Sequence, residues 1–321
     1  MTKFLPKILI LLVTFAVALI ARDPTGRLFV TNEGDDTVSV IDAKTGELVQ
    51  AINVGGRPRG IGFSPDRTHV YVALGDDNAI AVIDTATLAV LEKIPAGSDP
   101  EAFAVHPNGH IYLSNEDEGE ASVLNPETGE ILAQIKVGIE PEGVAIGPDG
   151  NRVYVTSEST SMVHVISVPE HEVVANILVG ARPREIAFSE DGKYGYVTCE
   201  VGGEVVKWDL ATNKIVDRKK LRREIRLVKP KGIRLGPDGK TFFIATGRGD
   251  VVALLDAETL DLQATIPVGR RVWGMAFSGD GKALYVTNGL DNNISVIDVD
   301  ARKEIKKIPV GEMPWGVIFD H

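Results

Sequence analysis

The chain has 321 residues, of which 44% are hydrophobic, and its formal net charge at pH 7 is −11. This length and composition permit a large buried core, and the negative charge excludes binding to nucleic acid or to an anionic membrane through net charge alone. The one cysteine, Cys199, excludes an intrachain disulfide.

Residues 1–21 have the pattern of a secretory signal peptide. Lys3 and Lys7 precede an apolar run over residues 8–20, and small residues allow cleavage after Ala18 or Ala21. We expect a periplasmic or secreted protein without stable membrane insertion once the segment is removed; a retained N-terminal anchor is the alternative. Cleavage after Ala21 removes two of the 34 basic residues and none of the 45 acidic ones, so the net charge becomes −13.

Residues 22–321 are predicted to be one domain built from a repeated unit. In the last unit, apolar runs at residues 283–288 and 294–298 are separated by a Gly/Asn/Asp turn, and an amphipathic run over 304–310 leads to a Pro-x-Gly signal. An aromatic residue in the first run marks every copy, with spacings of 42, 41, 42, 42, 47 and 42 residues: Phe29, Tyr71, Tyr112, Tyr154, Tyr196, Phe243 and Tyr285.

Seven copies with about four strands each predict an all-β fold, a seven-bladed β-propeller with four-stranded antiparallel blades. The inner strand of each blade is the run of small residues after the Pro-x-Gly signal, as in residues 60–63. The chain begins in the second strand of a blade, at residues 27–31, and ends in an inner strand, at residues 316–319. We therefore expect the C-terminal strand to complete the N-terminal blade and close the ring.

Loops that cross from the outer strand of one blade to the inner strand of the next should surround the mouth of the central channel. The residues at their ends combine clustered charge with two neighbouring tryptophans. We expect a small anion to bind there, with basic residues as charge partners and the tryptophans as a stacking wall. The candidate binding residues are Arg59, Glu101, Glu142, Arg182, Arg184, Lys231, Arg271, Trp273 and Trp315. The alternative is that acidic and basic loops only pair with one another.

Two further features belong to the sixth unit. An insertion adds the basic run at residues 218–226 to the crossing loop that also carries Lys231. Arg234 occupies an inner-strand position where the other units have Gly, Ala or Ile. Arg234 projects into the channel if that position faces inward, and requires a buried partner if it faces outward.

No catalytic or metal motif is recognisable. Acidic loops, such as residues 33–36 and 115–118, could hold Ca²⁺, but Asp, Asn and Gly are also the residues that tight turns require, so no metal is assigned. Cys199 is a lone nucleophile without a positioned base, which is more often a packed residue, and no Gly-x-Ser-x-Gly elbow or phosphate-binding loop is present. We assign neither catalytic residues nor a cofactor.

The runs at residues 29–32, 154–157 and 285–288, each followed by a Val-Ile-Asp or similar run, resemble secreted YVTN-repeat β-propellers. Together with residues 308–316 they are similar to the periplasmic β-propeller proteins associated with PQQ-dependent catabolism. The resemblance implies a role beside quinoprotein alcohol oxidation, with a periplasmic quinoprotein dehydrogenase or its cytochrome as partner.

Three functions follow as hypotheses. The first is a non-enzymatic binding protein whose channel mouth takes a partner protein or a small anion. The second is a lactonase-type hydrolase, because seven-bladed lactonases resemble this architecture, although the ring of candidate residues contains no His. The third is a protein that binds single-stranded nucleic acid through Trp273, Trp315 and the basic run at residues 218–226.

Overall fold

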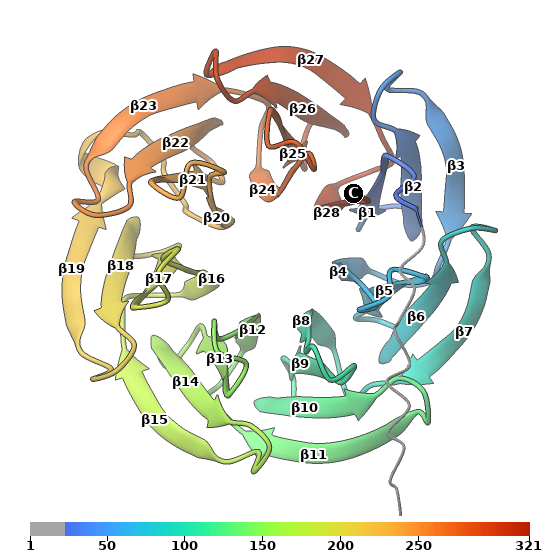
Figure 1. Cartoon of the computed structure of the whole chain (residues 1–321), viewed down its shortest axis with the longest axis horizontal. Helices are drawn as coiled ribbons and strands as arrows, with labels where there is room; N and C mark the ends of the chain where they lie inside the picture. The colour runs from blue at the N-terminus through green and yellow to red at the C-terminus, as the bar shows by residue number, and fades with distance from the viewer. Residues whose placement is uncertain (1–22) are drawn as a thin grey trace, which may run out of the picture.

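The computed structural model describes residues 23–321, and these residues form a ring of seven four-stranded antiparallel sheets (Figure 1). The predicted seven-bladed propeller is confirmed. The predicted signal segment, residues 1–21, lies outside the described residues. Within residues 23–321 no helix has the length and apolar character that crossing a membrane requires.

Each blade runs from an inner strand to an outer strand. Blade 1 contains β28 (Pro314–Phe319), β1 (Arg27–Asn32), β2 (Thr37–Asp42) and β3 (Leu48–Asn53). Blade 2 contains β4 (Pro58–Phe63), β5 (His69–Leu74), β6 (Ala79–Asp84) and β7 (Val90–Pro95). Blade 3 contains β8 (Pro100–Val105), β9 (Ile111–Asn115), β10 (Glu120–Asn125) and β11 (Glu130–Lys136). Blade 4 contains β12 (Pro141–Ile146), β13 (Arg152–Ser157), β14 (Met162–Ser167) and β15 (Val173–Leu178).

The remaining blades repeat this order. Blade 5 contains β16 (Pro183–Phe188), β17 (Tyr194–Cys199), β18 (Glu204–Asp209) and β19 (Ile215–Lys220). Blade 6 contains β20 (Ile233–Leu235), β21 (Thr241–Ala245), β22 (Val251–Asp256) and β23 (Leu262–Pro267). Blade 7 contains β24 (Val272–Phe277), β25 (Ala283–Asn288), β26 (Asn293–Asp298) and β27 (Lys303–Pro309).

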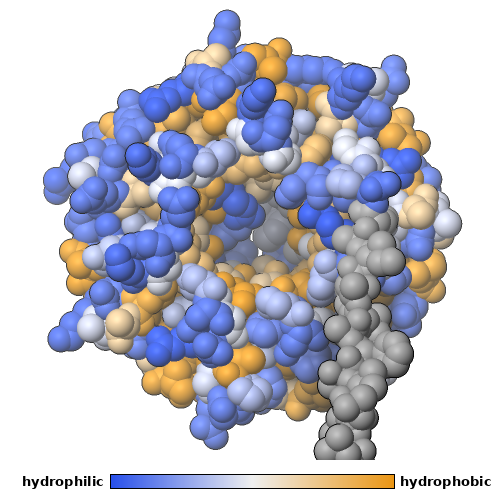
Figure 2. All heavy atoms as spheres, viewed as in Figure 1, coloured by the Kyte–Doolittle hydropathy of each residue, from blue (hydrophilic) through white to orange (hydrophobic). Residues whose placement is uncertain are grey.

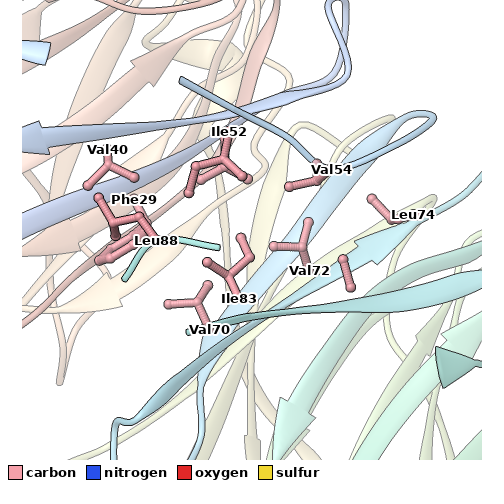
Figure 3. Packing of buried hydrophobic residues seen from close by; sticks show 11 residues of the cluster. Phe29, Val40, Ile52, Val54, Val70, Val72, Leu74, Ile83 and Leu88 are labelled. Carbon is pink, nitrogen blue, oxygen red and sulfur yellow. The ribbon is translucent and has the colours of Figure 1, made fainter. Parts of the chain in front are cut away.

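Apolar side chains fill the space between blades. The described residues form seven hydrophobic clusters, each built mainly from two adjacent blades. In the cluster between blades 1 and 2, Phe29, Val40 and Ile52 lie opposite Val70 and Ile83 (Figure 3). Fully burying such a side chain contributes roughly 1.5–3 kcal/mol. Each blade therefore depends on a neighbour on both sides.

The ring closes where its two ends pair. β28 lies antiparallel to β1, with Phe29 opposite Ile318 and Val30 opposite Val317. Beyond the strand, the Asp320 amide donates to the Arg27 carbonyl at 2.9 Å, and the Thr25 amide donates to Asp320 Oδ2 at 2.9 Å. The predicted closure by the C-terminal strand is confirmed, and the first blade gains its inner strand from the opposite end of the chain.

The insertion before β20 fills a gap between blades 5 and 6. It begins with a short 3₁₀ helix, η1 (Leu221–Arg223), and Leu221, Ile225 and Val228 are buried in the same cluster as Phe242. The polar residues between them face outward, and Lys219 Nζ lies 2.9 Å from Glu224 Oε1. The insertion is therefore anchored by its apolar residues, while the Arg222 side chain donates to the Val201 carbonyl in the turn after β17.

Removing residues 316–321 should open the ring, because blade 1 would lose its inner strand and two interblade clusters would lose a wall. We expect loss of the cooperative thermal transition and rapid proteolysis. Deleting His321 alone, which is exposed and lies beyond β28, is the control and should leave the transition in place. A truncated chain that melts like the full chain would contradict the closure.

Candidate functional site

The inner strands carry a recurring irregularity at the channel mouth. In blade 2, Pro58 pairs with Leu74 and Ile61 with Val72, so strand β4 has one extra residue between the two pairs. The same register shift occurs in blades 1, 3, 4, 5 and 7. A β-bulge redirects the side chain at the extra residue, and here the bulges contain six of the nine candidate mouth residues: Arg59, Glu101, Glu142, Arg184, Trp273 and Trp315.

The residue two positions earlier adopts a left-handed backbone in six of the crossing loops. These residues are Arg57, Asp99, Glu140, Arg182, Arg271 and Met313, with φ between 48° and 60°. For a residue other than Gly, this left-handed conformation is less stable than the right-handed one by about 1–2 kcal/mol. The repeated geometry shows that the loop shape is imposed by the fold, since neither Arg nor Glu favours it.

In five of the seven blades a buried hydroxyl at the end of the second strand bonds to the inner strand of the next blade. The Thr156 hydroxyl accepts the Gly143 amide at 2.7 Å and donates to the Arg184 carbonyl at 2.9 Å. Equivalent bonds to the next blade's mouth residue come from Thr31, Ser114, Thr198 and Thr287. Blades 2 and 6 have Ala73 and Ala245 at this position. Four Thr and one Ser of the repeat thus position five of the seven mouth residues.

The inner strands enclose a channel cavity of about 150 Å³, and the ring is visibly hollow at its centre (Figure 2). Five of the nine candidate residues line this cavity together: Glu142, Arg184, Lys231, Trp273 and Trp315. Arg234 also lines it, so this side chain faces the channel. The cavity therefore combines charged groups with an indole wall, as a small-molecule site requires.

The other four candidates surround the cavity without lining it. Glu101 is fully buried, and both Arg59 and Arg57 form ion pairs with it. Arg182 Nε lies 2.5 Å from Glu158 Oε2, and Arg271 Nη2 lies 3.4 Å from Glu33 Oε2. Arg182 is linked to the lining residue Arg184 through Glu158, and Arg271 lies over the ring of the lining residue Trp273.

The acidic partners Glu33, Glu158 and Glu200 were missed as site residues. They occupy the first position of the turn after the second strand; the turn at residues 33–36 was expected to be solvated, and no role was expected for Glu158 or Glu200. Arg59 Nη2 lies 2.7 Å from Glu33 Oε1, and Arg184 pairs with both Glu142 and Glu158. The signal was a Glu at this position in four of seven units. The mouth is therefore a network of paired charges rather than a wholly basic ring.

A second ion pair lies deeper in the channel. Arg234 pairs with Glu185, which also accepts the Ile233 amide through Oε2 at 2.8 Å, and both side chains line the cavity. Glu185 stands where other blades have Gly or Ala on the inner strand. This departure from the repeat was the signal for a partner of Arg234.

The tryptophans form the apolar wall of the cavity. Trp273 and Trp315 contact each other edge to face, with ring centroids 5.6 Å apart. Lys231 Nζ lies 3.8 Å from the Trp273 ring centroid, and the Arg271 guanidinium carbon lies 4.2 Å from it. The Trp315 Nε1 hydrogen-bond donor is buried and has no partner among the described residues. A buried donor without a partner is uncommon, and this one belongs to a side chain that lines the cavity.

Two groups at the mouth have pKa values near neutrality. Burial and the neighbouring Arg184 charge lower the pKa of Lys231 to about 7, against the attraction of Glu200. Burial and the Glu142 carboxylate raise the pKa of Glu101 to about 8, against the attraction of Arg59. Such shifts are concentrated at functional sites because burial and close charges are combined there.

Other candidates from the sequence behave differently. Asp99, Glu101 and Glu116 bring carboxylate oxygens close enough to hold a cation, but Arg57 and Arg59 already pair with two of the three. Cys199 is buried, and burial followed by the Glu204 charge raises the pKa of its thiol to about 12, so it is a packed thiol rather than a nucleophile at neutral pH.

Comparison with known proteins supports the architecture. The family model described as a seven-bladed β-propeller lactonase matches residues 170–305, which is less than half of the chain. Curated protein sequences contain no significant match.

Solved structures share the fold at low identity. A proposed 6-phosphogluconolactonase from Bacteroides fragilis is 20% identical, with a TM-score of 0.76 over 92% of this chain and 98% of that chain. A protein of unknown function from Desulfotomaculum acetoxidans is 16% identical, with a TM-score of 0.79 over 92% and 99% of the two chains. Hydrazine synthase of Kuenenia stuttgartiensis is 22% identical, with a TM-score of 0.71 over 81% and 89%.

Replacing Thr156 with Val should destabilise the fold, because the Gly143 amide and the Arg184 carbonyl would lose a buried partner. We expect a loss of about 1–3 kcal/mol in the free energy of unfolding. The matched control in the same blade is Thr160→Val, because the Thr160 hydroxyl has no partner among the described residues. Equal effects of the two substitutions would contradict the positioning role of Thr156.

Binding of a small carboxylate in the cavity should weaken as the pH rises from 6 to 9. Lys231, with a pKa of about 7, loses its positive charge in this range, and Glu101, with a pKa of about 8, gains a negative one. Both changes disfavour an anion. Calorimetric titration with acetate or gluconate across this range measures the effect, and tighter binding at the higher pH would oppose it.

Proposed function

We propose that the chain hydrolyses a small lactone in the channel cavity. The observation that carries the proposal is the meeting of a carboxylate, a guanidinium and an indole wall in one cavity of about 150 Å³. The partial match to the lactonase family model and the structural likeness to proposed 6-phosphogluconolactonases support this choice over a purely structural role.

The cavity supplies the groups that ester hydrolysis requires. Trp273 and Trp315 offer an apolar face for the C–H surface of a lactone ring. Glu142 is 5% exposed, and its Oε1 lies 2.5 Å from Arg184 Nη2. In our proposal Glu142 takes a proton from the attacking water, while Arg184 stabilises the negative charge that develops on the carbonyl oxygen.

The product of this reaction suits the same cavity. Ring opening converts the lactone into a hydroxy acid, and its new carboxylate lies among Arg184, Lys231 and Arg234, which all line the cavity. Each of these cations already has an acidic partner. The product carboxylate must therefore compete with these acidic partners for the cations. This competition weakens product binding and favours release.

The accessory role beside a quinoprotein dehydrogenase or its cytochrome, and the periplasmic location, remain predictions from the resemblance. For single-stranded nucleic acid the geometry is less suitable. The tryptophans lie on the inner strands β24 and β28, whereas the basic run begins on the outer strand β19. The basic run and the tryptophans therefore begin at opposite edges of their blades, which disfavours a continuous platform of stacking and basic side chains.

Glu142→Gln should lower lactone turnover by about 10²-fold, because the amide keeps the shape of the side chain but cannot accept the proton from water. Turnover of a small aldonolactone, followed by acid release, measures the effect. Glu130→Gln, at an exposed position on β11, is the control and should retain full activity.

Thermal melting of both variants separates lost chemistry from lost fold. If lactone turnover is unchanged in Glu142→Gln, Glu142 is not the general base. A chain that hydrolyses none of a panel of aldonolactones would overturn the proposed function.

A further inference from the structure

Lys231 is a buried amine at the wall of the cavity. Its side chain is 11% exposed, and Nζ lies 3.1 Å from Glu200 Oε2. Glu200 is shared, because Oε2 also lies 3.5 Å from Arg182 Nε and 3.7 Å from Arg184 Nη1. Lys231 therefore shares its one carboxylate partner with two arginines. The proposed lactone hydrolysis does not use the lysine as a nucleophile.

We propose that Lys231 is a nucleophile that forms an imine with a small 2-oxo acid bound in the channel cavity. This capture is a second activity of the cavity and does not depend on lactone hydrolysis. Three separate features of the site select a carbonyl compound that also bears a carboxylate.

The first feature is the position of Arg184 beside the amine. The guanidinium carbon lies 5.7 Å from the Trp273 ring centroid, and Lys231 Nζ lies 3.8 Å from the same centroid. The two groups therefore share one indole ring, and both lie within 3.7 Å of Glu200 Oε2. A guanidinium binds a carboxylate through parallel hydrogen bonds, which would hold the 2-oxo carbon toward the amine.

The second feature is the unpartnered donor of Trp315. Its Nε1 is buried and has no hydrogen-bond partner among residues 23–321, and the side chain lines the cavity. Attack of an amine on a ketone places developing negative charge on the carbonyl oxygen. The buried N–H is a spare donor in a side chain at the cavity wall, and it stabilises such an oxygen once a small turn of the indole brings it within reach.

The third feature is the protonation state of the amine. Burial and the Arg184 charge lower the pKa of Lys231 to about 7, so about half of the amines are neutral at that pH. An ordinary lysine, with a pKa of about 10.4, is neutral in fewer than about one molecule in a thousand at pH 7. Desolvation beside another cation is an established way of activating a lysine nucleophile.

The reaction balances with groups present in the site. Glu200 accepts a proton from the lysine ammonium, and the amine lone pair then forms a bond to the keto carbon. The carbonyl oxygen receives the displaced electron pair and is protonated to give a carbinolamine. Loss of that hydroxyl as water forms the C=N bond. One amine and one ketone are consumed, one imine and one water are formed, and no oxidant is required.

Reductive trapping tests the proposal. The purified chain is incubated with pyruvate and sodium cyanoborohydride at pH 7.5, and the adduct is located by peptide mass spectrometry. We expect one adduct per chain, at Lys231, formed on the order of tenfold or more faster than at any other lysine. Acetone, which lacks the carboxylate, should label Lys231 far more slowly.

Lys231→Arg keeps the positive charge beside Glu200 and Trp273 but removes the nucleophile, so it should abolish the site-specific adduct. Lys229→Arg, two residues earlier in the same loop, is the matched control and should label like the unaltered chain. Melting curves of both variants establish that they are folded. Labelling spread over surface lysines, or unchanged in Lys231→Arg, would overturn the proposal.

The trapping experiment contains no lactone, so its result is separate from the proposed hydrolase activity. A trapped adduct in a chain that hydrolyses no lactone supports the imine and rejects the hydrolase. Lactone turnover without an adduct supports the hydrolase and rejects the imine.

Discussion

The structure depends on mutual burial between neighbouring blades. A single four-stranded sheet has two faces, and each of the seven apolar clusters needs side chains from two blades. An open stack would leave two apolar faces in water. Pairing of β28 with β1 removes both at once, because the last strand becomes part of the first blade. The same closure brings Trp315, near the C-terminus, beside Trp273 of blade 7.

Crowding at the centre of the ring determines the chemistry of the mouth. The inner strands converge there, so charged side chains on the bulges become buried and require partners. Glu101 is fully buried against Arg59, and Arg184 is 5% exposed between Glu142 and Glu158. Burial disfavours the charged form of each group even though the group keeps its ion-pair partner. The pKa of Lys231 is therefore lowered to about 7, and the pKa of Glu101 is raised to about 8. A polar ligand that enters the cavity must therefore replace one partner of an existing ion pair.

Much of the fold could be predicted from the sequence, because a strand period of two and a repeat near 42 residues are local signals. The position of the mouth followed from the same repeat, and five of nine candidates do line one cavity. The acidic partners were harder. Glu33, Glu158 and Glu200 stand in turns where an acidic residue is common for local reasons, so the recurrence of Glu at this position in four of seven units was the one signal for them. Glu185 was missed because its role appears only beside Arg234 of the next blade.

The sequence by itself therefore determined the number of blades, the direction of closure and the residues offered to the channel mouth, since these follow from periodicity and chain order. The tertiary structure decided which charges meet, which are buried and which amine loses its proton near pH 7. Those properties depend on distances between side chains on different blades, such as the 3.1 Å between Lys231 and Glu200. Such distances arise only when the ring closes, because electrostatic energy depends on separation and burial rather than on residue type.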